Sequence, residues 1–298
     1  MKKCVISIFC LPYEIDMLER TLVQLKRSVP YLNDSVEFTL DVKISFGDEL
    51  VDWKNSKLDV EFFRSKFYSL RKYGEGFKEC KFSEGYKNSI NGCVSNRRTT
   101  LDVYNDYDFF IWLDTDIIFD ERTLSYFQTA MDSLDETHAH FVITPEIVRI
   151  WDTTWDCLVN DNYKNKPLNF HKTCDPYTES GITGTVELAP MMNVAPNPPM
   201  KFAGGWFTCI SGDLLRLIGV PQSFGHYGLE DTFIMFGSHI LNQKGYDIEQ
   251  FKLKNVIVCE DYMYRQNDHY INGLELIDRR EEYKKVAESN FNMELGKL

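Results

Sequence analysis

The fold of this chain is decided by the stretch Asp108-Phe109-Phe110-Ile111-Trp112-Leu113-Asp114-Thr115-Asp116. Five large apolar side chains in a row, residues 109–113, are typical of a strand that is buried on both faces. Two carboxylates, Asp114 and Asp116, follow at the carboxyl end of that strand, at the edge where open α/β sheets bind ligands. We therefore expect an α/β protein whose ligand site begins at this strand end.

The spacing of the two carboxylates predicts a cation site. Asp114 and Asp116 repel each other when they are held close, and burying them without partners is costly. Mn²⁺ or Mg²⁺ would relieve both problems, since such ions prefer oxygen ligands and often combine one or two carboxylates with substrate phosphates. The alternative is a solvated Asp-Thr-Asp turn that caps the next helix, and the pair alone leaves both interpretations open.

Length and charge limit the classes of protein that fit. The 298 residues suffice for one large domain or two small ones, and 43% hydrophobic and 26% charged residues are ordinary for a globular protein. The 33 basic and 45 acidic residues give a formal net charge of −12, which argues against a general polyanion binder.

The cysteines and the N-terminus predict a cytoplasmic protein. None of the eight cysteines forms a C-x-x-C pair, so a zinc site is not expected, and several lie in apolar runs where a free thiol behaves as a small hydrophobe. Met1-Lys2-Lys3 leads directly into a strand without a signal-peptide pattern, and no apolar run approaches the length of a membrane span.

The N-terminal segment has a β-α-β pattern. Residues 4–10 and 37–45 read as strands, and the apolar spacing between them predicts a helix that Pro30 closes, so the strands should be parallel. Pro12, Tyr13 and Asp48 would then lie at strand ends where a nucleotide base could rest. Ordinary turn chemistry explains these three residues as well.

Residues 54–98 are locally basic, with eleven basic and five acidic residues and interleaved aromatic side chains. Such a segment could hold a phosphorylated donor or an anionic acceptor such as nucleic acid, or it could be a solvated helical face. The predicted helix over 88–104 carries Arg97 on its apolar stripe, and a buried arginine needs an anionic partner. The candidate anions are the carboxylates after the next strand and a bound diphosphate, and Lys87 lies at the helix start, where phosphates bind well.

The middle of the chain predicts a helix over 124–134 and a short strand over 141–144 that ends at Pro145. Residues 160–200 hold six of the ten prolines and little periodicity, which is typical of a functional loop. Trp151 and Trp155 precede this loop and could stack on a sugar or belong to the core, as could Tyr163 within it.

A glycine turn over 204–205 precedes a further predicted strand that reaches residue 210, and Ser211 is expected to cap the helix that follows. Further on, Glu230 and Asp231 begin another helix after two glycines. Acids at a helix start are favoured by its dipole for structural reasons alone, but the same dipole keeps a carboxylate ionised, as a general base requires. His269, beyond the last predicted strand at 256–259, is either a metal ligand or a structural histidine.

These motifs, in this order, resemble those of the metal-dependent GT-A glycosyltransferases. The resemblance spans residues 4–270, and it is to the inverting family-2-like and β-galactosyltransferase-like groups. It rests on Phe-Phe-Ile-Trp-Leu-Asp-Thr-Asp, then Gly-Gly-Trp-Phe, Gly-x-Glu-Asp and a late histidine. The chain departs from the family at the first two strand ends, where it has Leu-Pro-Tyr and Phe-Gly-Asp, and these departures leave the nucleotide open.

The resemblance implies a role for each matching residue. Asp116 would bind Mn²⁺ or Mg²⁺, Asp114 would contact the nucleotide ribose or the metal through water, and His269 would complete the metal site. Asp231 would deprotonate an acceptor hydroxyl and Glu230 would orient the acceptor. The pocket and the diphosphate site would include Gly204, Gly205, Trp206, Lys87 and Arg97.

The same resemblance implies a single GT-A domain over 1–298, with a central mixed, mostly parallel sheet flanked by helices. Residues 1–120 would bind the nucleotide-diphosphate sugar, residues 121–275 the acceptor, and residues 276–298 would form a C-terminal helix. The expected reaction is sugar transfer with inversion to a glycan, a lipid-linked sugar, a protein or a hydroxymethylated base in DNA. A retaining enzyme, a nucleotidyltransferase and a non-catalytic carbohydrate-binding protein remain as alternatives.

Overall fold

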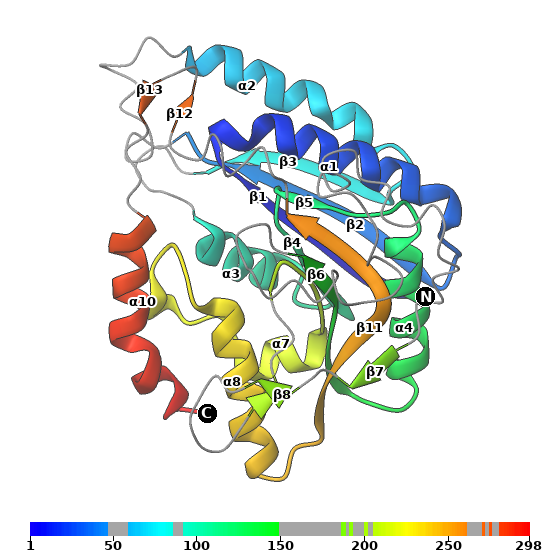
Figure 1. Cartoon of the computed structure of the whole chain (residues 1–298), viewed down its shortest axis with the longest axis vertical. Coiled ribbons are helices and arrows are strands. Elements are labelled where there is room, and N and C mark those ends of the chain that lie inside the picture. The colour runs from blue at the N-terminus through cyan, green and yellow to red at the C-terminus, as the bar shows by residue number, and fades with distance from the viewer. Residues whose placement is uncertain are drawn as a thin grey trace.

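The computed structural model describes residues 1–46, 59–85, 92–148, 186–188, 191–192, 200–201, 205–260, 270–271, 274–275 and 280–298. These residues build a nine-stranded sheet with helices on both faces (Figure 1). The strands of the sheet are β1 (Lys2–Cys10), β2 (Val36–Ile44), β3 (Glu79–Glu84), β4 (Phe109–Leu113), β5 (Ile117–Ile118), β6 (His140–Val148), β7 (Val186–Leu188), β10 (Phe207–Ser211) and β11 (Ile248–Glu260). Two separate antiparallel pairs join β8 (Met191–Met192) to β9 (Met200–Lys201) and β12 (Tyr270–Ile271) to β13 (Leu274–Glu275).

The strand order is β3-β2-β1-β4-β10-β6-β11-β5, and β7 also pairs with β11. Strands β3, β2, β1 and β4 are parallel, β6 and β11 are parallel to each other, and β10 runs antiparallel to both of its neighbours. The expected α/β architecture, a mixed and mostly parallel sheet flanked by helices, is confirmed.

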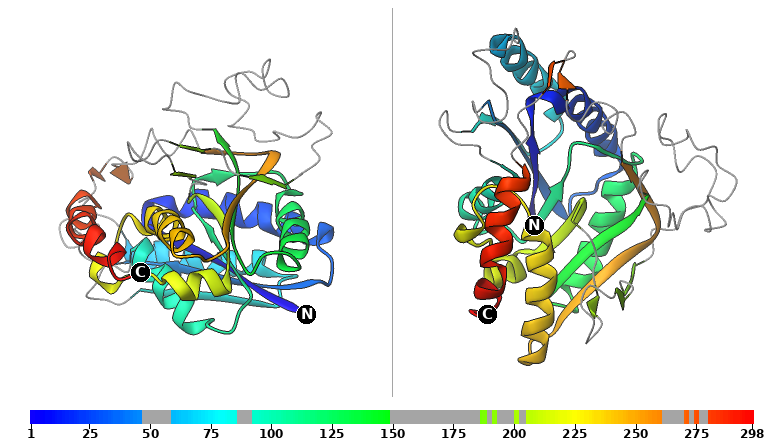
Figure 2. Two further views of the ribbon diagram at one scale, coloured as in Figure 1. Left: turned by 90° about the horizontal axis from the view of Figure 1, so that it is seen from below. Right: turned by 60° about the vertical axis from the view of Figure 1, so that its left-hand side comes forward.

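The helices form two layers, one on each face of the sheet (Figure 2). The first layer contains α1 (Ile15–Ser28), α2 (Val60–Ser69) and α4 (Thr123–Asp135). The second contains α3 (Cys93–Val103), α7 (Gly212–Ile218), α8 (Glu230–Gln243) and α10 (Arg280–Leu295). Short 3₁₀ turns are η1 (Pro12–Glu14), η2 (Val29–Tyr31), η3 (Leu70–Gly74) and η4 (Gln222–Phe224).

Strand β4 lies between the two layers, as its sequence predicts. Phe109 and Ile111 pack into the core beneath α1 and α4, whereas Phe110 and Trp112 pack into the core beneath α3 and α8. Successive side chains of a strand point to opposite faces, so an uninterrupted apolar run is needed where both faces are covered. This central strand delivers Asp114 and Asp116 to the carboxyl edge of the sheet.

Two local expectations are wrong. Strand β6 does not end at Pro145 but continues to Val148, and its partner β11 has a register irregularity between Leu253, opposite Pro145, and Ile257. The irregularity comes directly after Pro145, which as a proline has no backbone N–H to donate to the sheet. Ser211 occupies the N-cap position of α7, but its hydroxyl accepts a hydrogen bond from the Phe141 N–H (3.1 Å) instead of capping the helix.

Cys4, Cys10, Cys80, Cys93 and Cys209 are free thiols, and Cys4, Cys10 and Cys209 are buried in the apolar core as expected. Among the described residues, no helix combines the length and the apolar character needed to cross a bilayer.

Candidate functional site

The Asp114-Thr115-Asp116 turn is held in place by its middle residue. Thr115 is buried, its hydroxyl donates to Glu14 Oε2 (2.9 Å), and its carbonyl accepts from the Thr21 hydroxyl (2.9 Å). The Asp114 N–H donates to the Trp206 carbonyl (3.0 Å), which ties the turn to the residue before β10. Backbone and threonine contacts therefore fix the position of the two carboxylates.

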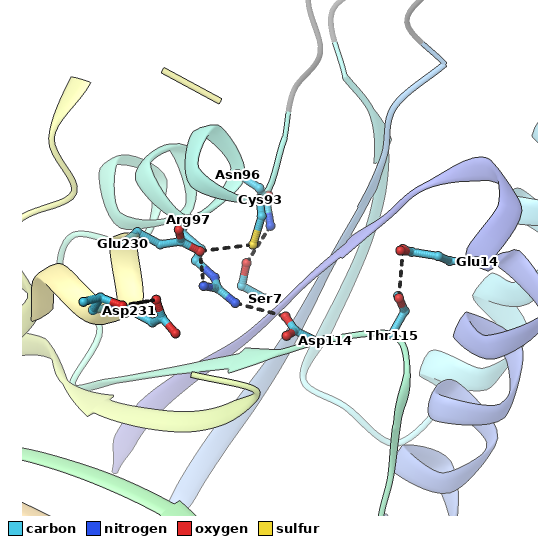
Figure 3. Close-up of polar contacts among 10 residues, drawn as sticks. Ser7, Glu14, Cys93, Asn96, Arg97, Asp114, Thr115, Glu230 and Asp231 are labelled. Atoms are coloured by element: carbon cyan, nitrogen blue, oxygen red, sulfur yellow. Dashed lines mark hydrogen bonds and ion pairs between the residues drawn. The ribbon is translucent and has the colours of Figure 1, made fainter. Parts of the chain in front are cut away.

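Glu14 is a site residue that the sequence reasoning missed. Its carboxylate is buried, and it accepts from the Leu11 N–H (2.9 Å) as well as from Thr115 (Figure 3). The signal was present, because Glu14 stands at the third position of a helix start that Pro12 opens, where a glutamate reaches back to the cap backbone. This capping contact also joins the end of β1 to the acidic turn.

Arg97 lies between the two acidic segments of the chain. Its Nη2 donates to Asp114 Oδ1 (3.0 Å), and its Nη1 forms an ion pair with Glu230 Oε1. Its guanidinium carbon is 4.5 Å from the centre of the Trp112 ring, a cation–π contact on the buried face of α3. Arg97 was expected to need an anionic partner, and Asp114, one of the candidate carboxylates, supplies one. The other candidate, a bound diphosphate, stays a prediction.

The turn before α8 has an unusual backbone. Gly225 and Gly228 have φ values of +71° and +93°, and Leu229, with φ +66°, is the single non-glycine residue with positive φ in the described part of the chain. A left-handed leucine is strained and persists only where its surroundings enforce it. This turn places Glu230 beside Arg97 of α3, with Asp231 as the next residue of α8 (Figure 3).

Asp231 is held by its own helix start and by close packing against a glycine. Its Oδ1 accepts from the N–H (2.6 Å) and the hydroxyl (3.3 Å) of Thr232. A Cβ on Gly205 would lie 2.5 Å from the Cβ of Asp231, far inside van der Waals contact. Gly205 thus permits the approach of Asp231 to the turn before β10.

Both acidic segments line one cleft of about 380 Å³, a size typical of small-molecule sites. Asp114 and Asp116 come from the turn after β4, Glu230 and Asp231 from the start of α8. The remaining lining side chains include Phe9, Leu11, Glu14, Cys93, Arg97, Trp206, Tyr227, Tyr283 and Lys284. The last two belong to α10, so the C-terminal helix forms part of the wall.

Burial shifts several titrations in this cleft. Desolvation raises the pKa of Asp114, with the negative charges of Asp116, Glu230 and Asp231 adding to the shift and Arg97 opposing it. Desolvation also raises the pKa of Glu230, again against the attraction of Arg97. Burial raises the pKa of the Cys93 thiol well above its ordinary value, which makes Cys93 a poor nucleophile.

The residues present fit a divalent cation in part. Asp114 keeps 36% of its side chain exposed, has one oxygen bound to Arg97, and lines the cleft together with Asp116. Among the described residues, no cluster of three or more His, Cys, Asp or Glu side chains is arranged to hold a metal. A site that takes one or two carboxylates and substrate phosphates does not need such a cluster.

The other predicted site residues are placed as follows. Pro12 is buried in η1, and Tyr13 lies in the same 3₁₀ turn after β1. Gly205 and Trp206 line the cleft. Asp48, Lys87, Gly204 and His269 lie outside the described residues, as do Trp151, Trp155 and Tyr163.

The basic segment over 54–98 is partly paired within the described part of the chain. Four of its described cations form ion pairs with acids of the same and neighbouring elements, namely Arg64 with Glu61 and Glu84, Lys66 with Asp16, Lys78 with Glu37, and Lys81 with Glu79. These pairs reduce the positive charge that the segment offers to a polyanion.

No known protein family and no curated protein matches this sequence. Among solved structures, the chain is similar to S. aureus TarS. The crystal structure of TarS residues 1–349 shares 15% identity, with a TM-score of 0.45, over 88% of this chain and 60% of that one. A second TarS crystal structure shares 16% identity, with a TM-score of 0.43, over 89% of this chain and 37% of that one. The chain thus spans less than two thirds of either TarS chain, and identities this low say nothing about activity.

Proposed function

We propose that this protein is a GT-A-type glycosyltransferase that moves a sugar from a nucleotide-diphosphate donor to an acceptor hydroxyl. One observation supports this most strongly: Asp116 and Asp231, over a hundred residues apart, line the same cleft. Sugar transfer requires two separate functions, one at the departing diphosphate and one at the incoming hydroxyl. The cleft offers a carboxylate pair for each.

The reaction that fits these groups is a single displacement. The acceptor oxygen forms a bond to the anomeric carbon while the bond from that carbon to the diphosphate oxygen breaks, and the nucleoside diphosphate leaves with the bonding electrons. Asp231 takes the proton of the acceptor hydroxyl, a step that contributes roughly 10²–10⁴-fold to such reactions. Attack from the side opposite the leaving group inverts the anomeric configuration.

Asp114 and Asp116 are the residues that would hold Mn²⁺ or Mg²⁺, and His269 would join them if the family pattern extends to this chain. The bound cation would supply compensation for the negative charge that builds on the diphosphate. Thr115 and Glu14 keep the two carboxylates in place before substrate arrives, so no binding energy is needed to organise them. Trp206 and Tyr227 provide flat surfaces in the same cleft on which a sugar ring can pack.

The acceptor is a hydroxyl compound that reaches the side of the cleft between α8 and α10. The pairing of the basic residues over 59–85 favours a glycan or another small acceptor over modified DNA.

The test is donor hydrolysis and transfer with purified protein. Incubation with Mn²⁺ and a panel of nucleotide-sugars should release one nucleoside diphosphate slowly, detected by chromatography. Asp231→Asn should lower transfer by about 10²–10⁴-fold and leave donor binding, measured by calorimetry, within about twofold of wild type. Asp213→Asn, at an exposed acid in the first turn of α7, makes the same chemical change away from the cleft and should leave both quantities unchanged.

Two results would contradict the proposal. Hydrolysis or binding of no donor in the panel removes the enzyme assignment. Loss of donor binding in Asp231→Asn shows that Asp231 serves the donor and not the acceptor.

A further inference from the structure

Arg97 is the one described cation that contacts both acidic segments of the cleft. It reaches Asp114, beside the proposed cation, with one guanidinium nitrogen and Glu230, beside the proposed base, with another. Only 7% of its side chain and 6% of that of Glu230 are exposed, so water screens this ion pair weakly. A single positive charge is therefore shared by two carboxylates, one from the turn after β4 and one from the start of α8.

The bridge has little freedom to rearrange. The guanidinium lies over the Trp112 ring, with its carbon 4.5 Å from the ring centre, and this contact limits its movement. Glu230 Oε1 also accepts from the Cys93 thiol (3.4 Å), and Glu230 itself begins α8. Because the partners are anchored in α3, α8 and β4, a loss of charge at Glu230 changes how strongly Arg97 binds Asp114.

We infer that Arg97 couples Glu230 to cation binding at the Asp114-Thr115-Asp116 turn, so that Glu230 acts as a positioning residue through Arg97. When Glu230 is charged, Arg97 divides its hydrogen bonds between Glu230 and Asp114, so its ion pair with Asp114 is weak enough for Asp114 to bind a cation. Without the Glu230 charge, Arg97 pairs with Asp114 alone and competes with the cation for it. This inference takes one thing from the proposed function, namely the assignment of the cation site to Asp114 and Asp116.

The inference predicts the direction of the change in Mn²⁺ affinity. Glu230→Gln should weaken Mn²⁺ binding although Glu230 is not proposed as a ligand. Part of the loss of Mn²⁺ affinity would come simply from removing a negative charge near the cleft. Asp231→Asn measures that part, because it removes the same charge from the next residue. Among the described interactions, Asp231 makes no direct contact with Arg97. We expect about tenfold weaker Mn²⁺ binding for Glu230→Gln and about twofold for Asp231→Asn.

The experiment is a mutant cycle with Mn²⁺ alone as the probe, read from the electron paramagnetic resonance signal of the free ion. Arg97→Met removes the charge and keeps an apolar chain against Trp112, and it should bind Mn²⁺ at least as tightly as wild type because Asp114 is released. In the Arg97→Met background, Glu230→Gln should weaken Mn²⁺ binding no more than Asp231→Asn does, about twofold.

Arg97→Lys is the second background, since an ammonium keeps the charge but does not span two carboxylates as a guanidinium does. There too, the excess effect of Glu230→Gln should disappear. Circular dichroism melts establish which variants fold, and if Arg97→Met does not fold, the lysine background decides.

Three results would overturn the inference: equal effects of Glu230→Gln and Asp231→Asn in the wild-type background, a Glu230→Gln effect that persists when Arg97 is replaced, or no Mn²⁺ binding by the wild-type protein. Failure of the proposed function gives a different result: the Mn²⁺ affinities of the variants follow the expected pattern, but no nucleotide-sugar is consumed. Conversely, turnover without the Arg97-dependent effect leaves the function in place and removes the coupling.

Discussion

At the scale of single residues, Gly205 sets how closely the Asp231 carboxylate approaches the turn before β10. The space that a Cβ would need at this position is already taken by Asp231 itself, and Trp206, the next residue, holds the Asp114 N–H through its carbonyl. One glycine thus controls the separation between the base candidate and the acidic turn.

Gly205→Ala should therefore displace Asp231 and lower sugar transfer. A misplacement of about 1 Å costs on the order of 10²-fold in rate, and we expect a loss of this size in kcat. Steady-state transfer kinetics measure the loss, and a melting curve confirms that the variant folds. Gly296→Ala is the matched control, because a Cβ there meets only ordinary contacts at 3.5 Å. Equal kcat values for the two variants would show that Gly205 does not position the base.

Single residues also show what the sequence can reveal. The position of Arg97 on an apolar helical stripe predicts that an anion faces it, and Asp114 is one of the few acids that follow Arg97 closely in the sequence. Its second partner, Glu230, was not predictable, because it comes from a helix 133 residues away whose position depends on the whole fold. Glu14 was missed although its capping pattern was visible, because nothing local links it to Thr115.

At the scale of elements, the acidic turn depends on the start of the first helix layer. Glu14 in η1 and Thr21 in α1 both bond to Thr115, so the junction between β1 and α1 positions the end of β4. Strand β1 is the neighbour of β4 in the sheet, which makes this support short and direct.

Glu14→Ala should destabilise the protein and disturb this turn. It leaves the buried Leu11 N–H and Thr115 hydroxyl without their acceptor, at a cost of about 2–3 kcal/mol in the free energy of unfolding. Urea denaturation followed by circular dichroism measures the change. Glu136→Ala, at the exposed C-terminal end of α4, is the control and should change stability by less than about 0.5 kcal/mol. A similar small change for Glu14→Ala would mean that the turn holds its shape without this carboxylate.

Several strands and helices could be predicted from the local pattern of apolar residues alone. Alternating or continuous apolar runs predicted β1, β2 and β4, and helical spacing predicted α1 and α4. Proline normally breaks a strand, so the sequence predicts that β6 ends at Pro145, whereas the register irregularity of the pair lies in β11, more than a hundred residues later. The antiparallel direction of β10 between β4 and β6 likewise has no local signature.

At the scale of the whole molecule, the cleft is assembled from both ends of the chain. Leu11 and Glu14 lie near the N-terminus, and Tyr283 and Lys284 lie in the C-terminal helix. Lys284 packs its carbon chain over Gly228, next to the strained turn before α8, and α10 contributes the buried Ala287 to the core. The predicted C-terminal helix exists as α10, but its place in the cleft wall could not be foreseen, because only tertiary packing brings it there.

A cation bound to such an assembly should stabilise the entire fold, because the unfolded chain lacks the site. At a concentration of one hundred times its Kd, Mn²⁺ should add about 2.7 kcal/mol, which corresponds to roughly 5 °C in Tm for a chain of this size. EDTA should reverse the shift, and with it any donor hydrolysis. Asp116→Asn should abolish the Mn²⁺-dependent shift because it removes the carboxylate most directly assigned to the ion. Asp213→Asn, an equal change of charge at an exposed position of α7, should retain it. Scanning calorimetry with and without Mn²⁺ makes the comparison, and an undiminished shift in Asp116→Asn would place the ion elsewhere on the protein.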